Sequence, residues 1–283
     1  AIMKICRTVA ECRAAVATFR RSGETVGLVP TMGFLHDGHI SLVAAAKTHT
    51  DRVVVTIFVN PTQFGDAADL DAYPRDETRD LDMLSAAGVD VVLIPDVSDV
   101  YPNGDETIVE TTRMANMLHG LVRPGHFRGV TTVVARLFNF VQPDVACFGE
   151  KDYQQLQVIK RMARDLAFPI DIRGVPTVRE ADGLAMSSRN VRLSAQDRMA
   201  AVVLSQSLDA AEQQAGAGST IEDLRALIQT TIASEPRATL RGLDIVGATD
   251  LSDLSGALIT PAAIMISVEF GGILLIDQRV VTP

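Results

Sequence analysis

The stretch ETVGLVPTMGFLHDGHISLVAAAKTH, residues 24–49, predicts a strand, a loop and a helix in succession. Residues 24–30 form a short β-type run, and residues 38–49 have the pattern of a helix. The loop between them contains glycine and leads into two histidines. In an open α/β sheet, ligands bind at the carboxyl ends of strands, next to helix N-termini. We therefore expect a ligand site at this loop.

Apolar runs of strand length alternate with helical patterns as far as residue 178. Strands are expected at 52–59, 89–95, 143–149 and 169–178, and helices at 76–87, 128–142 and 152–167. The strands are nearly apolar on both faces, which indicates a parallel sheet covered by helices on both sides. The first 23 residues predict an amphipathic helix that ends at Gly23.

The pattern changes after residue 178. Residues 194–218 predict one long helix, and residues 220–234 predict another that opens with a Thr-x-x-Asp capping signal. Runs of β type follow near 240–248, 262–270 and 272–276. We therefore predict an α/β fold with a Rossmann-like parallel sheet at 1–177 and a smaller α+β domain at 178–283.

The composition favours a small-molecule partner. The net charge is −9 and there is no long Lys/Arg run, which argues against nucleic acid. No stretch approaches the roughly 18 apolar residues of a membrane span, and the N-terminus has no apolar core of a signal peptide. Cys6, Cys12 and Cys147 have no metal-binding spacing and fit a reducing compartment. We therefore expect a cytoplasmic protein without nucleic-acid or membrane partners.

The segment VPTMGFLHDGHISLV (29–43) places His36 and His39 at the start of the expected helix. Free N–H groups and the helix dipole make such a start an anion site. Three residues apart on a first turn, the two imidazoles share one face and can donate to phosphate oxygens. Gly38 leaves room for a nucleotide close to the backbone. Taken alone, HxGH also fits a metal pair or ordinary surface histidines.

The segment EADGLAMSSRN (180–190) lies at the expected domain boundary. Ser187, Ser188 and Arg189 combine two hydroxyls with a guanidinium, which suits polyphosphate. A loop at a hinge can close over bound nucleotide. The same residues could instead cap a helix.

The segment GEKDYQQLQ (149–157) lies between a strand end and a helix start. Gly149 permits close approach, Lys151 suits phosphate, and Asp152 can accept from ribose hydroxyls. Gln155 lies one helical turn on and can bind a polar substrate. A surface Lys–Asp pair that caps a helix is the alternative.

The segment FVNPTQF (58–64) leaves the second parallel strand. Asn60 and Gln63 supply uncharged amides, and Phe58 and Phe64 supply apolar walls. This combination describes a pocket for a small hydroxylated acid. A proline-containing turn without a ligand is the alternative.

Together these segments resemble the pantothenate synthetase family, ligases that join pantoate to β-alanine in the coenzyme A pathway. PTMG-x-LH-x-GH, FVNPTQF, GEKDYQQL and ADGLAMSSRN occur in the family's order, and RPGHFRGV (123–130) also matches. The resemblance covers nearly all of the first 190 residues; beyond them it is limited to the helix-then-sheet character. The family shares its HIGH-type signature with a wider nucleotidyl-transferase group. Phe34 departs from the smaller residue expected there, which bears on loop packing.

The resemblance implies a reaction in two steps. The pantoate carboxylate first attacks the α-phosphorus of ATP and gives pantoyl-adenylate and pyrophosphate. The β-alanine amine then attacks the activated carbonyl, and AMP leaves. Mg²⁺ is expected with ATP because it offsets phosphate charge. The family is usually homodimeric, so a homodimer is expected here.

The resemblance also assigns residues to the substrates. Phosphate contacts fall to His36, His39, Lys151, Ser187, Ser188 and Arg189, of which His36, His39, Lys151 and Arg189 are the catalytic candidates. The adenosine site falls to Met32, Gly149, Asp152, Val178 and Met186. Pantoate falls to Gln63 and Gln155, with Asn60 nearby. Asp80 is the candidate metal ligand, although a solvated helix face also explains it. Arg123 and His126 are candidates for the pyrophosphate or β-alanine side.

Three other functions compete with this hypothesis. The nearest is a nucleotidyltransferase that acts on a phosphorylated small molecule, which would need more cations than the two amide motifs supply. An aminoacyl-tRNA synthetase fragment conflicts with the acidic charge and the lack of a tRNA-binding appendage. A non-catalytic nucleotide-binding regulator would need neither the substrate amides nor a full set of phosphate donors.

Overall fold

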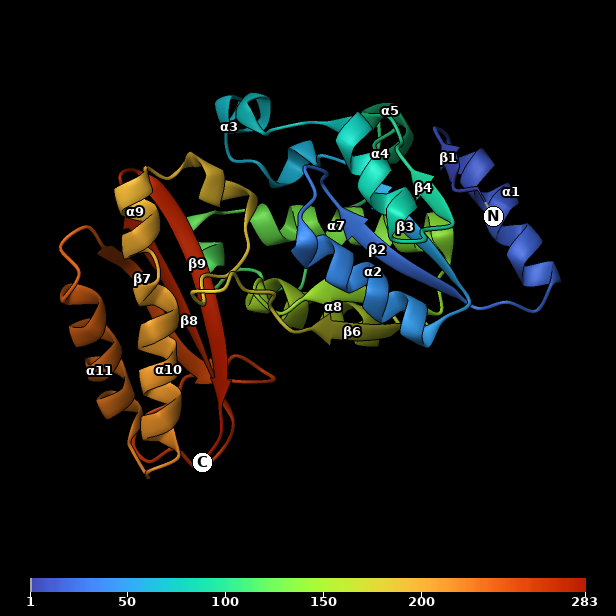
Figure 1. The fold of residues 1–283 in the computed structure, drawn as a ribbon. Coiled ribbons are helices and arrows are strands. Elements are labelled where there is room, and N and C mark those ends of the chain that lie inside the picture. Colours follow the sequence, from blue (N-terminus) through green and yellow to red (C-terminus); the bar gives the residue numbers. More distant parts are fainter. Residues whose placement is uncertain (1) are drawn as a thin grey trace. The chain divides into compact units, whose positions relative to one another are not determined.

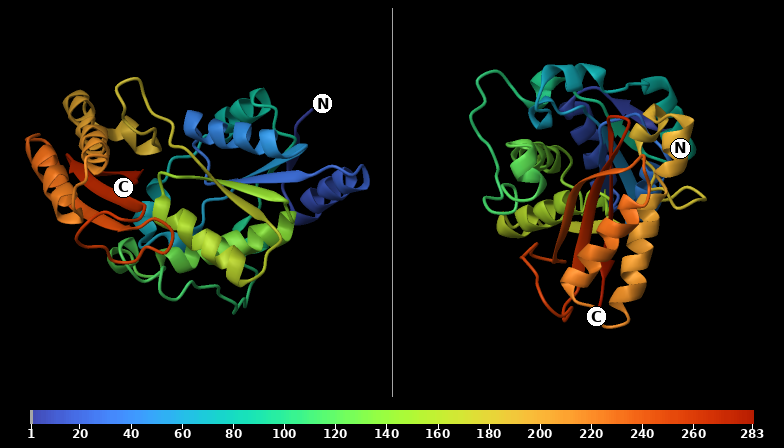
Figure 2. Two further views of the ribbon diagram at one scale, coloured as in Figure 1. Left: turned by 90° about the horizontal axis from the view of Figure 1, so that it is seen from below. Right: turned by 90° about the vertical axis from the view of Figure 1, so that its left-hand side faces the viewer.

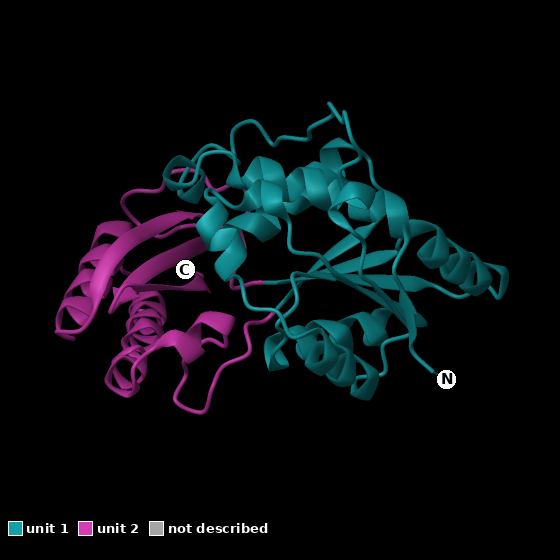
Figure 3. Ribbon diagram, turned by 90° about the horizontal axis from the view of Figure 1, so that it is seen from above, with its two compact units in different colours: residues 1–149, 154–175 teal, residues 150–153, 176–283 magenta. Residues whose placement is uncertain are grey.

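The computed structural model describes residues 2–283, which form two compact units (Figures 1 and 3). Unit 1 extends to Gly149 and resumes at Gln154–Val175, and unit 2 comprises Glu150–Tyr153 and Pro176–Pro283. The sequence placed the boundary between residues 177 and 178 and kept 150–153 in the first domain. Residues 150–153 group with unit 2 because their side chains bond there. Tyr153 donates to the carbonyl of Ala248 at 2.6 Å, and Lys151 donates to that of Met186 at 3.3 Å.

Unit 1 contains a six-stranded parallel sheet in the order β1-β4-β3-β2-β5-β6. The strands are β1 (Lys4–Cys6), β2 (Val26–Thr31), β3 (Arg52–Ile57), β4 (Val91–Leu93), β5 (Val145–Gly149) and β6 (Asp171–Val175). From β2 the chain moves outward through β3 and β4, and it later returns to the other side of β2 with β5. The strand order therefore reverses between β2 and β5, which is where doubly wound sheets bind ligands.

Helices cover both faces of this sheet (Figure 2). The helices of unit 1 are α1 (Val9–Arg21), α2 (Asp37–His49), α3 (Ala67–Ala72), α4 (Glu77–Ala86), α5 (Val97–Val100), α6 (His119–Val122), α7 (His126–Val141) and α8 (Tyr153–Asp165), with a 3-10 turn η1 (Pro61–Gln63). Leu28 and Val54 pack with α1, α7 and α8, whereas Val29 and Val55 pack with α2 and α4. Two buried faces explain why the central strands β2 to β5 are largely apolar, and the predicted parallel α/β architecture is confirmed.

The start of unit 1 differs from the single helix expected over the first 23 residues. Lys4–Cys6 form strand β1 beside β4, and α1 begins only after Thr8, whose side chain accepts the N–H of Glu11. The strand has three residues, and only Cys6 is buried. So short an edge strand has no alternating pattern from which to predict it.

Unit 2 is a three-stranded antiparallel sheet packed with helices. It comprises η2 (Ser188–Arg192), α9 (Ala195–Ala200), α10 (Val203–Ala215), α11 (Ile221–Ala233), β7 (Thr239–Gly247), β8 (Ala262–Phe270) and β9 (Ile273–Val281). The α+β prediction is confirmed, as is the cap of α11, where Thr220 accepts the N–H of Asp223. The predicted long helix 194–218 is wrong, because a tight turn in which Leu204 N–H bonds to Ala201 separates α9 from α10.

The structure bears on two expectations drawn from the composition, which concern membrane spans and the three cysteines. Across residues 2–283, no helix has both the length and the apolar character to cross a membrane. Cys6, Cys12 and Cys147 are fully buried as free thiols. Burial raises the pKa of Cys12 to about 12 and that of Cys147 to about 11. These cysteines are therefore neutral parts of the core at physiological pH.

Candidate active site

The two histidines after β2 form a reciprocal cap on α2. His36 is the N-cap residue, and its Nδ1 accepts the backbone N–H of Gly38 at 3.0 Å. In return, Nδ1 of His39 accepts the backbone N–H of His36 at 3.1 Å. Because each Nδ1 accepts a hydrogen bond, each neutral imidazole carries its proton on Nε2. The ring centroids lie 4.2 Å apart, so the pair supplies two neighbouring N–H donors of the kind that bind phosphate oxygens.

The imidazole ring of His36 occupies the space beside Gly38. A Cβ on Gly38 would lie 2.6 Å from Cε1 of His36 and 2.8 Å from its Nδ1. From the sequence, this glycine is predicted to leave room for a nucleotide close to the backbone. In the structure, it is needed for the imidazole that caps the helix.

Asp80 holds the loop in front of the histidines. Its carboxylate is 2% exposed, and its oxygens accept the N–H groups of Phe34 at 2.9 Å and Leu35 at 2.8 Å. Among residues 2–283, no group of three His, Cys, Asp or Glu side chains is placed to hold a metal ion. Asp80 as a metal ligand stays a prediction; in this structure each of its oxygens accepts one backbone N–H and so supports the loop.

Phe34 adopts a backbone conformation that bulky residues rarely take. Its φ is +50°, and that of Gly33 is +79°. The two hydrogen bonds to Asp80 offset the strain, and Arg79 adds a third restraint by donating to the carbonyl of Leu35 at 2.9 Å. The Arg79 guanidinium also lies 5.7 Å from the Phe34 ring centroid. The unusual residue at position 34 thus lies in a loop fixed from α4.

Asn60 is the centre of a buried network of hydrogen bonds within the protein. It is 1% exposed. Its Nδ2 donates to Oε1 of Gln63 at 2.9 Å and to the carbonyl of Gly129 at 3.1 Å. Its Oδ1 accepts from Thr62 Oγ1 at 2.9 Å and from the Tyr101 hydroxyl at 2.6 Å. The amide of Asn60 thus orients Gln63, and a place of Asn60 near pantoate stays a prediction.

Gln63 is also held through its main chain. Its carbonyl accepts from Arg123 Nη2 at 3.3 Å and lies 2.9 Å from Nδ1 of His126. Arg123 and His126 were candidates for the pyrophosphate or β-alanine side, and the structure brings both to Gln63. A Cβ on Gly129 would lie 2.8 Å from the carbonyl oxygen of Thr62, so only glycine lets α7 approach η1 this closely.

The two adjacent glutamines of α8 have different environments. Gln154 is buried, donates to the carbonyls of Met114 and Met117 and accepts the N–H of His119. Gln155 is half-buried, and its amide makes no hydrogen bond within residues 2–283. Gln155 is therefore the glutamine available to a substrate, whereas Gln154 fixes the segment before α6.

Met32 and Gly149 lie at the strand-order reversal. Met32 directly follows β2 and is half-buried, and Gly149 ends the neighbouring β5. A Cβ on Gly149 would meet no protein atom within 4 Å. The backbone is thus open to a ligand at the carboxyl end of β5, which supports the predicted adenosine contact at this glycine.

The loop of unit 2 that carries Ser-Ser-Arg starts as a small hairpin. Met186 N–H bonds to the carbonyl of Val178 at 2.9 Å, which brings these two predicted adenosine residues together. Ser187 Oγ then accepts the N–H of Arg189 at 3.1 Å and caps η2. Arg189 itself donates to the carbonyl of Leu274 on β9 at 3.0 Å. The predicted helix-cap alternative is therefore real for Ser187, and Arg189 is held by the protein in this structure.

Lys151 belongs to the same unit as this loop. Its Nζ contacts the Met186 carbonyl, while the neighbouring Asp152 is exposed and Ser188 half-buried. The hairpin also depends on a pair that the motifs did not reveal. Arg179 bonds to both oxygens of Asp277, at 2.7 and 2.8 Å, and Asp277 is 2% exposed.

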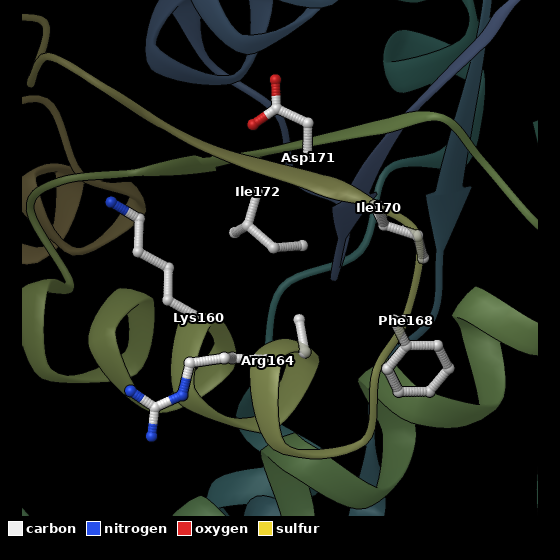
Figure 4. Close-up of a pocket in the computed structure, with 7 residues that line it drawn as sticks. Lys160, Arg164, Phe168, Ile170, Asp171 and Ile172 are labelled. Carbon is white, nitrogen blue, oxygen red and sulfur yellow. The ribbon is translucent and has the colours of Figure 1, made fainter.

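A separate surface hollow of about 260 Å³ lies between α8 and the edge strand β6 (Figure 4). It is lined by Lys160, Ala163, Arg164, Phe168, Ile170, Asp171 and Ile172. None of these is a candidate site residue, and its two cations face solvent beside apolar side chains. The hollow is therefore lined by none of the residues that the motifs predict to bind the substrates.

Comparison with known proteins decides the family. The family profile described as pantoate-β-alanine ligase matches residues 4–280. The chain belongs to the pantoate–β-alanine ligase family. The pantothenate synthetase of Agrobacterium fabrum is 49% identical over 282 residues, which cover 99% of this chain and 96% of that relative. The resemblance to this family that the four motifs indicated is thereby confirmed, and it extends over residues 4–280.

Solved structures of the family share this fold. The crystal structure of pantothenate synthetase from Thermus thermophilus matches with a TM-score of 0.93 and 46% identity, over 99% of this chain and 100% of that one. The ligase from Francisella tularensis, described as complexed with β-γ ATP and β-alanine, matches with a TM-score of 0.80 and 33% identity, over 98% of this chain and 97% of that one. The two-part α/β fold is therefore the fold of this ligase family.

Proposed function

We propose that this member of the pantoate–β-alanine ligase family forms pantothenate through pantoyl-adenylate, with ATP, pantoate and β-alanine as substrates. The family match supports the ligation. The Francisella tularensis structure, complexed with β-γ ATP and β-alanine, supports two of the substrates. The matches argue against a nucleotidyltransferase that acts on a phosphorylated small molecule. The observation that carries the adenylate route is the pair of Nε2–H donors at His36 and His39.

The histidine pair acts on the phosphates of ATP. Attack by the pantoate carboxylate on the α-phosphorus increases the negative charge on the phosphate oxygens. Two fixed N–H donors stabilise that charge without any reorganisation of the site. Each imidazole can donate through Nε2 while its Nδ1 keeps the hydrogen bond to the backbone.

The remaining phosphate contacts are proposed for unit 2. Lys151, Ser187, Ser188 and Arg189 combine a point charge, two hydroxyls and a planar fork of donors. Arg189 would exchange its bond to Leu274 for one to phosphate. The adenosine contacts are proposed for Met32, Gly149, Asp152, Val178 and Met186.

Pantoate is proposed to bind the amides of Gln63 and Gln155 in unit 1. Oε1 of Gln63 is occupied by Asn60, so Gln63 offers its N–H₂ group. An N–H donor suits a carboxylate or a hydroxyl oxygen of the acid. Bound in this way, pantoate keeps an oxygen for attack, and catalysis consists of positioning and charge stabilisation.

Mg²⁺ is proposed to arrive with ATP rather than in a protein cage. Asp80 accepts two backbone N–H groups that fix the loop, and so we assign it to the loop rather than to the ion. Mg²⁺ commonly retains waters and binds substrate phosphates. The ion would supply charge neutralisation of the phosphates.

A homodimer in the cytoplasm is proposed from the family resemblance and the three buried thiols. Light scattering of the purified protein tests the dimer, with a monomer at all concentrations as the contrary result.

Pantoate-dependent exchange between ATP and pyrophosphate, measured without β-alanine, tests the reaction. Exchange that requires pantoate is expected, because only a reversible adenylate returns labelled pyrophosphate to ATP. Protein that binds ATP but shows no exchange with pantoate would contradict the adenylate route. A parallel assay with phosphorylated acids then tests the nucleotidyltransferase.

A further inference from the structure

We propose that Tyr101 is a positioning residue for pantoate, acting through Asn60 on the amide of Gln63. The inference rests on the proposed pantoate contact of Gln63. Tyr101 follows α5 and lies outside every motif that indicated the site. The Tyr101 hydroxyl does not need to touch the substrate, because it acts on the amide of Asn60, which in turn orients Gln63.

The Tyr101 hydroxyl holds the amide of Asn60 in place. It donates to Oδ1 of Asn60 at 2.6 Å, and Thr62 adds its Oγ1 at 2.9 Å and its N–H at 3.3 Å to the same oxygen. A buried amide turned by 180° would set Oδ1 against the carbonyl of Gly129 and Nδ2 against the N–H of Thr62, and both contacts would be repulsive. These two groups therefore keep Nδ2 on the side of Gln63, and the short bond from Tyr101 holds Oδ1 in place.

The orientation of Asn60 then decides that of Gln63. Nδ2 of Asn60 donates to Oε1 of Gln63 at 2.9 Å. Gln63 consequently presents its N–H₂ group and not its carbonyl oxygen. A carboxylate has only acceptor atoms at neutral pH, so it binds the first arrangement and is repelled by the second.

Tyr101 is suited to this task because it is held rigidly and stays protonated. The Arg136 guanidinium lies 4.8 Å from the centroid of its ring. Arg136 is fixed in turn by the carbonyls of Val100 and Thr107, each at 2.8 Å, and by an ion pair with Asp105. Burial is the main cause that raises the pKa of Tyr101 above its usual value, so the hydroxyl remains a donor.

The substitution Tyr101→Phe removes the hydroxyl and keeps the ring. Asn60 Oδ1 then keeps only its bonds from Thr62, and the loss of one buried hydrogen bond corresponds to about tenfold in an equilibrium. We expect the KM for pantoate to rise about tenfold in ATP–pyrophosphate exchange, with the KM for ATP unchanged. Tyr153→Phe is the matched control, because Tyr153 also donates one bond, to Ala248, but has no link to Gln63. Its pantoate KM should stay at the wild-type value.

A double-mutant cycle with Gln63→Ala separates positioning from general loosening. If Tyr101 acts through Gln63, Tyr101→Phe adds no further rise in pantoate KM once Gln63 is alanine. An undiminished tenfold effect in the Gln63→Ala background would overturn the positioning role, as would an unchanged pantoate KM in the single Tyr101→Phe variant. An unchanged pantoate KM in Gln63→Ala alone would instead overturn the pantoate contact of the proposed function. Thermal unfolding of each variant establishes that the measured protein is folded.

Discussion

Nδ1 of His39 accepts the backbone N–H of His36 and so closes the turn that carries both imidazoles. In each ring, Nδ1 accepts a backbone N–H at the start of the helix. Nε2 is the atom proposed to donate to the phosphates. One side chain therefore caps the helix with one atom and is proposed to contact a substrate with another. This division makes the two tasks separable by substitution.

His39→Asn tests that division. The asparagine Oδ1 reaches about as far as Nδ1 and can still accept the N–H of His36, but nothing replaces Nε2. We expect a stability close to wild type and a rate of adenylate formation lower by about 10²–10³-fold, the usual cost of one lost transition-state donor. Single-turnover formation of pantoyl-adenylate measures the rate, and direct binding measures pantoate affinity. A wild-type rate would remove His39 from the chemistry.

Asp80→Asn tests whether this carboxylate supports the loop or binds metal. The amide keeps one acceptor oxygen but cannot accept both N–H groups of Phe34 and Leu35. We expect a loss of about 2–3 kcal/mol in the free energy of unfolding, because hydrogen bonds to a buried charged group are strong. The Mg²⁺ concentration for half-maximal activity should not change at fixed ATP. A large increase in that concentration would favour Asp80 as a metal ligand.

Gly129→Ala tests the close approach of α7 to η1. The added methyl would lie 2.8 Å from the carbonyl oxygen of Thr62, so η1 must move and Gln63 with it. We expect about 1–3 kcal/mol of destabilisation and a raised KM for pantoate. Gly216→Ala is the control, since its Cβ would meet nothing closer than 3.6 Å. Equal behaviour of the two variants in urea unfolding and in pantoate KM would contradict the packing argument.

The buried thiols predict a loss of stability in alkali. Their pKa values in the folded protein, about 12 for Cys12 and about 11 for Cys147, exceed the usual 9.0. Above pH 9 the unfolded chain loses these protons first, so the free energy of unfolding falls as pH rises through 9 towards 11. A drop on the order of 2 kcal/mol or more is expected.

Urea unfolding at pH 8.5, 9.5 and 10.5 measures this drop against a Cys12→Ala/Cys147→Ala variant. Other groups titrate equally in both proteins, so the difference between the slopes isolates the thiols. Parallel slopes would show that the thiols are not responsible. At pH 8 a Cys147→Ser variant should keep most of its activity, since the thiol has no part in the proposed chemistry.

The chain's local patterns determined most of the architecture. Largely apolar runs predicted a sheet buried on both faces, and each strand from β2 to β6 overlaps a predicted run. Long periodic segments are readable because burial acts on many residues at once. The three-residue β1 and the break between α9 and α10 were not predicted, because a short edge pairing and a single tight turn leave no periodic signal.

The sequence by itself determined the family and the kinds of residue in the site, because its motifs keep side-chain chemistry at fixed positions along the chain. The tertiary structure decided which of those side chains are free for a substrate. Asp80 and Asn60 both carry groups that suit a ligand. In the structure, the carboxylate of Asp80 accepts two backbone N–H groups. The amide of Asn60 forms hydrogen bonds with Gln63, Gly129 and Tyr101. Hydrogen-bond capacity is consumed by neighbours that are distant in sequence, and so only folding reveals what remains for a ligand.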